Sequence, residues 1–219
     1  MQLFGPVSLV IPAAGVGERL GGSHKISLCI GGRTLLNWVV QRLEPLVDEI
    51  IVAYPAGHLA PIEPGIRAIP GGASRQATVH LLAQAATGTY TVVHDVARPF
   101  VSRAVTARLL QQLAHADAVT AVLPMTDTVM HEGEHHVIER GELLRVQTPQ
   151  AFATAALLAA HERARAEGFV ATDDFQLVRR NGGTTAHVLG SEFTRKITTR
   201  EDIAIAEALA ASGALKDFV

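Results

Sequence analysis

The 219-residue sequence has little cysteine, few aromatic residues and no long apolar run. The single cysteine, Cys29, excludes an internal disulfide framework and is typical of a reducing compartment. No apolar stretch reaches the roughly 20 residues of a membrane-spanning helix, and the N-terminus lacks the basic and apolar regions of a signal peptide. The formal net charge of −2 does not favour nucleic-acid or membrane binding. We therefore expect a cytoplasmic protein that binds neither nucleic acid nor membrane.

Short apolar segments rich in β-branched residues alternate with helix-like segments. The strand-like segments are almost continuously apolar, as in strands covered on both faces; they are Val7–Ile11, Glu49–Tyr54, Thr91–His94, Ala118–Leu123 and Thr185–Leu189. The helix-like segments are Leu35–Leu43, Arg75–Ala86, Arg103–Leu113, Ala151–Arg165 and Glu201–Ala211. This alternation predicts an α/β fold in a single domain over residues 1–219, with a Rossmann-like, mostly parallel sheet and helices on both of its faces.

The segment from about residue 127 to residue 147 departs from this alternation. It reads "DTVMHEGEHHVIERGELLRVQ", with a polar turn around Glu132–His135 and apolar residues on either side. This pattern predicts a protruding β-arm or hairpin rather than a crossover helix. Because single-domain proteins often embrace a second subunit with such an arm, we expect a homodimer formed through it.

A glycine-rich stretch, "AAGVGERLGGSHK", follows the first strand-like segment. Loops at the carboxyl ends of parallel strands are where such sheets bind ligands. The stretch is not a dinucleotide-binding motif, because Leu20 replaces its third glycine and the second strand ends at Tyr54 without an acidic residue. It also lacks the Gly-Lys-Ser/Thr of a P-loop. We expect a phosphate cradle made of backbone N–H groups, with Arg19 and Lys25 adding positive charge.

Seven sequence motifs together resemble one family of nucleotidyltransferases. In chain order they are "PAAGVGERLGGSHK", "GGASRQATV", "VVHDVARPFV", "MTDT", "RVQTPQAF", "ATDD" and "RKITTREDIAIAE". The resemblance is to 2-C-methyl-D-erythritol 4-phosphate cytidylyltransferase and extends from about Val7 to Ala211. It implies transfer of a cytidylyl group from CTP to the polyol phosphate, with release of pyrophosphate, in non-mevalonate isoprenoid precursor biosynthesis.

The resemblance also implies roles for individual residues. Arg19 and Lys25 would stabilise charge on the triphosphate, whereas Arg140 and Lys196 would position the incoming phosphate, with Arg140 serving the neighbouring subunit's site. The residues implied to contact the nucleotide are Ala13, Ala14, Gly15, Gly72, Arg75 and Thr78. Those implied to contact the polyol phosphate are Asp95, Val96, Arg98, Thr128, Thr148 and Thr172. The implied cofactor is Mg²⁺ or another divalent cation, held largely by the CTP phosphates, and its protein ligands stay open.

Three alternatives to this function stay open at this point. One is the sister activity on ribitol 5-phosphate, which shares the nucleotide half of the reaction. Another is nucleotidyl transfer to a sugar 1-phosphate with UTP or GTP, and the last is a regulatory subunit that binds a nucleotide without turnover. A separate ambiguity concerns Asp173 and Asp174, which either form a carboxylate pair for acid–base chemistry or begin a helix. We favour the helix N-cap, because Asp is common there.

Overall fold

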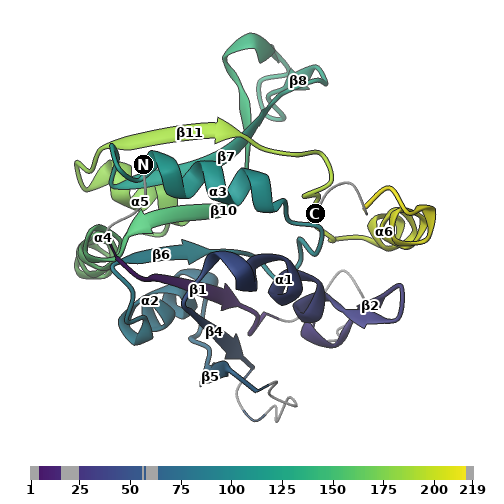
Figure 1. The fold of residues 1–219 in the computed structure, drawn as a ribbon. Coiled ribbons are helices and arrows are strands. Elements are labelled where there is room, and N and C mark those ends of the chain that lie inside the picture. The colour runs from purple at the N-terminus through teal and green to yellow at the C-terminus, as the bar shows by residue number, and fades with distance from the viewer. Residues whose placement is uncertain (1–4, 16–24, 56, 58–63, 216–219) are drawn as a thin grey trace.

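A computed structural model describes residues 5–15, 25–55, 57 and 64–215 (Figure 1). At its centre lies a seven-stranded sheet with the strand order β11-β7-β10-β6-β1-β4-β5. Its strands are β1 (Val7–Pro12), β4 (Glu49–Tyr54), β5 (Ile66–Pro70), β6 (Tyr90–Val93), β7 (Ala118–Pro124), β10 (Leu144–Ala153) and β11 (Thr185–Leu189). All neighbouring pairs are parallel except those made by β10, which runs antiparallel to both β6 and β7. The predicted mostly parallel sheet is confirmed.

Helices cover both faces of this sheet, as predicted (Figure 1). The side chains of β1 show why, because Leu9 and Ile11 enter one core cluster while Val10 enters the other. Successive side chains of a strand point to opposite faces, so a fully apolar strand needs a cover on each side. The first cluster includes side chains of α1 (Leu35–Leu43) and α3 (Arg103–Gln112). The second includes those of α2 (Arg75–Ala85), α4 (Thr154–Glu167) and α5 (Asp174–Arg180).

Two sheet strands were not predicted, and one of them corrects a predicted helix. The segment Ala151–Ala153 belongs to β10 and pairs with β6, so α4 begins only at Thr154. The other strand is β5, which lies at the sheet edge with Ile66 as its one buried residue and therefore gives a weak sequence signal. Both corrections concern strands with polar residues or proline, which sequence patterns place poorly.

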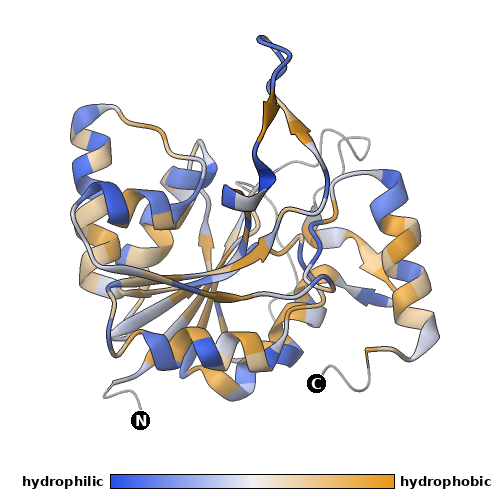
Figure 2. Ribbon diagram, turned by 90° about the horizontal axis from the view of Figure 1, so that it is seen from above, coloured by the Kyte–Doolittle hydropathy of each residue, from blue (hydrophilic) through white to orange (hydrophobic). Residues whose placement is uncertain are grey.

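The predicted hairpin is present and projects from the body of the protein (Figures 1 and 2). It is formed by β8 (Val129–Met130) and β9 (Val137–Ile138), which pair antiparallel. The arm is shorter than the predicted 127–147, because the segment from Leu144 onward pairs with β7 in the central sheet. The shortened arm still carries Arg140 in a 3-10 turn, η4 (Arg140–Glu142).

Most of the remaining elements lie beside the carboxyl edge of the sheet. A small antiparallel pair, β2 (Cys29–Ile30) and β3 (Arg33–Thr34), follows the 3-10 turn η2 (Lys25–Ser27). The last helix, α6 (Arg200–Ser212), contacts β2. A further 3-10 turn, η3 (Glu44–Leu46), extends α1. Within the described residues, no helix combines the length and the apolar character that crossing a membrane requires.

Candidate active site

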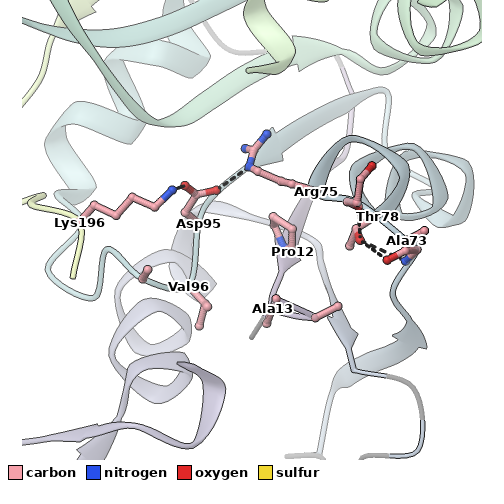
Figure 3. Close-up of a pocket in the computed structure, with 13 residues that line it drawn as sticks. Pro12, Ala13, Ala73, Arg75, Thr78, Asp95, Val96 and Lys196 are labelled. Carbon is pink, nitrogen blue, oxygen red and sulfur yellow. Dashed lines mark hydrogen bonds and ion pairs between the residues drawn. The ribbon is translucent and has the colours of Figure 1, made fainter. Parts of the chain in front are cut away.

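A cavity of about 400 Å³ opens where β1, β5 and β6 end (Figure 3). Its walls come from the loops that follow these strands and from one residue near the C-terminal helix. The lining residues are Pro12, Ala13, Ala14, Gly15, Gly72, Ala73, Ser74, Arg75, Thr78, Asp95, Val96, Ala97 and Lys196. This is the position at which parallel α/β sheets bind ligands, because backbone N–H groups and helix N-termini converge there.

Glycines let the loops after β1 and β5 approach each other at the base of this cavity. A Cβ on Gly71 would overlap the Cβ of Ala14, and one on Gly72 would lie 2.8 Å from the Cβ of Ala77. Next to them, the N–H of Gly72 donates to Thr78 Oγ1 at 3.0 Å. By contrast, a Cβ on Gly15 would meet nothing within 4 Å, so this backbone borders open space. The two loops therefore pack closely at Gly71 and Gly72, which form the base of the cavity, whereas the backbone at Gly15 faces open space.

Three charged side chains form a row across the cavity (Figure 3). Arg75 Nε lies 3.1 Å from Asp95 Oδ1, and Lys196 Nζ lies 2.8 Å from Asp95 Oδ2. Arg75 is the first residue of α2, which Ser74 caps by accepting a hydrogen bond from Ala77 N. Residues far apart in the sequence thus place two cations on one carboxylate.

The charges of this row stabilise one another. Burial by itself would raise the pKa of Asp95, but Arg75 and Lys196 outweigh it and hold that pKa well below the usual range. Burial likewise lowers the pKa of Arg75, but Asp95 and Asp174 outweigh it and raise that pKa above its ordinary value. Asp95 is therefore a carboxylate, and not an acid that donates a proton, at neutral pH.

A second cavity, of about 490 Å³, shares Lys196 with the first. Its other lining residues are Arg98, Asp127, Arg145, Val146, Gln147, Glu192, Arg195, Thr198, Thr199, Glu201 and Asp202. Arg98 Nη1 donates to the carbonyl of Thr194 at 2.8 Å, which holds this guanidinium at the cavity wall. Lys196 thus lines both cavities, and a ligand in either one could reach its ammonium group.

The structure brings most of the expected site residues together. The first cavity includes all six expected nucleotide contacts and, of the expected polyol contacts, Asp95 and Val96. Arg98 lines the second cavity. Thr148 lies behind the site, where its Oγ1 accepts a hydrogen bond from Asp95 N at 3.1 Å. It therefore contacts the backbone of the charged row rather than the open cavity.

Other expected residues lie elsewhere or outside the described part. Thr128, Thr172 and Arg140 are exposed and line neither cavity. Arg140 Nη1 donates instead to the carbonyl of Thr126 at 2.7 Å, at the base of the arm. Arg19 and the side chain of Lys25 lie outside the described residues, so their roles stay predictions.

The sequence analysis missed a buried partner of Arg75. Asp173 caps α5, as expected, by accepting a hydrogen bond from Gln176 N at 3.0 Å. The next residue, Asp174, is only 1% exposed and lies 2.8 Å from Arg75 Nη1. The two adjacent aspartates of "ATDD" were the available signal. An N-cap uses only one of the two carboxylates, so the second one still needed a partner.

Comparisons with known proteins show which family the sequence matches. Residues 7–212 match the family model of 2-C-methyl-D-erythritol 4-phosphate cytidylyltransferase. The enzyme of that name from Thermus thermophilus is 46% identical over 207 residues, 93% of this chain and 97% of that protein. The one from Deinococcus radiodurans is 44% identical over 203 residues, 91% of this chain and 88% of that protein.

Solved structures give the same result. The crystal structure of the Thermus thermophilus enzyme has a TM-score of 0.86 and 44% identity, and the match covers 94% of this chain and 99% of that one. A structure from Anaerococcus prevotii, described as a 4-diphosphocytidyl-2C-methyl-D-erythritol synthase, has a TM-score of 0.81 and 27% identity, covering 94% of this chain and 98% of that one. With its sequence and its fold both matched, the chain belongs to the 2-C-methyl-D-erythritol 4-phosphate cytidylyltransferase family.

Proposed function

We infer that this chain transfers the cytidylyl group of CTP to 2-C-methyl-D-erythritol 4-phosphate, giving 4-diphosphocytidyl-2-C-methyl-D-erythritol and pyrophosphate. The observation that carries this inference is the row of Arg75, Asp95 and Lys196 across the first cavity, which ends at Lys196 where the second cavity begins. A reaction that joins a nucleotide to a second phosphate needs adjoining sites for two anions. The relatives compared above bear the name of the methylerythritol enzyme, which does not favour the ribitol alternative.

The reaction requires positioning and charge stabilisation more than a protein nucleophile. A phosphate oxygen of the acceptor attacks the α-phosphorus of CTP, and the bond from that phosphorus to the bridging oxygen breaks as pyrophosphate leaves. The attacking oxygen is already anionic, so no Ser, Cys or His is needed as a nucleophile. The barrier arises largely from bringing two anions together in line, and cations at Arg19, Lys25 and Lys196 would lower it.

We place the nucleotide in the first cavity. Its base would lie near Gly72 and Thr78, and its phosphates near the backbone of Ala14 and Gly15, where open space borders the chain. The acceptor would lie between the two cavities, with its hydroxyl groups on Asp95. Its phosphate would then reach the ammonium group of Lys196, which lines both cavities.

The residues of the first cavity fit a divalent cation held mainly by the nucleotide. Among the described lining residues, Asp95 is the one carboxylate, and each of its oxygens already has a cationic partner at 3.1 Å or closer. Mg²⁺ prefers oxygen ligands and commonly takes them from substrate phosphates. When bound, such an ion would neutralise charge on the triphosphate and its leaving group.

We further propose that the arm pairs two copies of the chain. Met130 and Val137 lie on its two strands and are 55% and 65% exposed, which is unusual for neighbouring apolar side chains on a projecting hairpin. Arg140 lies on the same arm and lines neither cavity of its own chain. An arm that crosses to a partner would cover the apolar side chains and bring Arg140 to the partner's acceptor phosphate.

The activity is tested by measuring pyrophosphate release from CTP with methylerythritol 4-phosphate and with ribitol 5-phosphate in parallel. We expect release with the first acceptor, and release only with the second would overturn the assignment. Lys196→Ala and Arg140→Ala should raise KM for the acceptor while CTP binding survives. The control Arg163→Ala removes an exposed cation of α4 and should change neither the acceptor KM nor the affinity for CTP. Unchanged acceptor KM in both site variants would contradict the division of roles.

The phosphate-cradle residues are tested by kcat. Arg19→Ala and Lys25→Ala should each lower kcat by about 10²–10³, as does loss of one well-placed donor in comparable sites. Circular dichroism should show an intact fold in both variants. Turnover close to that of the unsubstituted enzyme in both would end this assignment.

A further inference from the structure

We propose that the buried pair His161 and Asp174 positions Arg75, and through it the carboxylate of Asp95, for the acceptor substrate. The proposal rests on the function inferred above and adds to it two residues that touch neither cavity. His161 lies on α4 and Asp174 is the first residue of α5, so both belong to helices behind the site. They are positioning residues rather than catalytic ones.

An unbroken chain of polar contacts joins this pair to the active site. His161 Nε2 donates to Asp174 Oδ1 at 3.1 Å, and Arg75 Nη1 donates to Asp174 Oδ2 at 2.8 Å. The same guanidinium donates from Nε to Asp95 Oδ1 at 3.1 Å, and the other oxygen of Asp95 accepts from Lys196. Both oxygens of each carboxylate are therefore occupied, which leaves the guanidinium of Arg75 one orientation that satisfies both aspartates.

The backbone that carries Asp174 is anchored from two directions. Gln150 of β10 donates from Nε2 to Asp173 Oδ2 at 2.9 Å, which ties the start of α5 to the central sheet. Gln76 of α2 accepts from Ala171 N at 2.9 Å, which ties the preceding loop to the helix that carries Arg75. The carboxylate is thus fixed relative to both the sheet and α2, as a positioning group must be.

Packing alone does not account for polar groups at this place. His161 and Asp174 are each only 1% exposed in their side chains, and an ion pair with a buried member, such as Asp174 with Arg75, contributes little or nothing to stability compared with apolar side chains of similar volume. What such a pair does supply is direction, because an arginine that donates to two carboxylates from two different nitrogens is held in a defined orientation. The direction here is toward Asp95, the carboxylate that we assign to the acceptor hydroxyl groups.

Loss of Asp174 should therefore affect the acceptor more than the nucleotide. Arg75 would keep Asp95 as a single partner and could rotate about it, so the carboxylate would no longer be held at a fixed angle to Lys196. Of the six expected nucleotide contacts only Arg75 is disturbed; those at Gly72 and Thr78 depend on backbone and on the Thr78 hydroxyl, which this change does not touch. We expect Asp174→Asn to raise KM for the acceptor about tenfold and to change KM for CTP less than about threefold.

A double-mutant cycle tests whether Asp174 acts through Arg75. If it does, Asp174→Asn should raise acceptor KM about tenfold in the unsubstituted enzyme and have almost no effect in the Arg75→Met background. Thr34→Ala is the control, because it removes the N-cap of another helix, α1, and no contact of His161, Asp174, Arg75 or Asp95. It should lower Tm and leave the ratio of the two KM values unchanged.

A second pair of variants keeps the test decisive if Asp174→Asn folds poorly. His161→Gln retains a donor and should keep most of the acceptor affinity, whereas His161→Leu should reproduce the selective rise in acceptor KM. Equal effects of the two His161 variants, or Asp174→Asn effects that simply add to those of Arg75→Met, would overturn the proposal. Failure of the unsubstituted enzyme to use the acceptor would instead refute the proposed function, so the two failures are distinguishable.

Discussion

His94 should make the stability of this protein depend on pH in the mildly acidic range. The side chain is fully buried directly after β6, with Nε2 3.0 Å from the carbonyl of Arg98 and Nδ1 3.2 Å from Thr148 Oγ1. Burial lowers its pKa from 6.5 to about 4, because an imidazolium in this position would lose its hydration. The folded protein therefore holds His94 neutral at a pH where the unfolded chain binds a proton.

The magnitude follows from the difference between the two pKa values. A shift of one unit corresponds to about 1.4 kcal/mol, so the shift of His94 to about 4 corresponds to about 3 kcal/mol. Between pH 6.5 and about 4 the unfolded state binds more protons, so the free energy of unfolding falls as the pH falls. The contribution is fully present above pH 6.5 and is lost by the time the pH reaches the folded-state pKa.

Urea denaturation at several pH values between 7.5 and 4.5 measures this contribution. The difference in the free energy of unfolding between the unsubstituted protein and His94→Gln gives the contribution of His94, because the other titrating groups are common to both. We expect the free energy of unfolding to fall more steeply with decreasing pH in the unsubstituted protein. Parallel pH dependences in the two proteins would refute the reasoning, and so would an imidazole NMR titration that placed the pKa of His94 near 6.5.

Two further predictions concern the stability of local structure. Asp202→Ala removes the carboxylate that accepts hydrogen bonds from Thr198 and from Thr199 N at the start of α6. We expect it to lower the free energy of unfolding, measured by urea denaturation, by about 2 kcal/mol. An unchanged denaturation midpoint would contradict this role. Gly71→Ala should lower Tm because its Cβ overlaps that of Ala14, whereas Gly15→Ala should leave Tm unchanged and weaken CTP binding; equal Tm values for these two variants would argue against the close-packed base.

The sequence alone was enough to predict the parallel core of the fold and the place of the site. The run Val7–Ile11 is apolar at every position but Ser8, which requires cover on both faces and therefore a sheet between helices. The glycine-rich segment after it identified one wall of the cavity, because the conformation of a short loop depends mainly on the residues of that loop. The polar turn in the arm predicted a hairpin for the same reason.

The tertiary structure alone decided which distant residues meet. β10 contains Pro149 and buried glutamines, so nothing local marks it as a central strand; its place depends on antiparallel pairing with β6 and β7. The contact between Arg75 and Asp174 joins positions 99 residues apart, and sequence spacing says nothing about such a pair. Local patterns specify elements because their causes lie within a few residues, whereas an ion pair across the fold depends on how those elements pack.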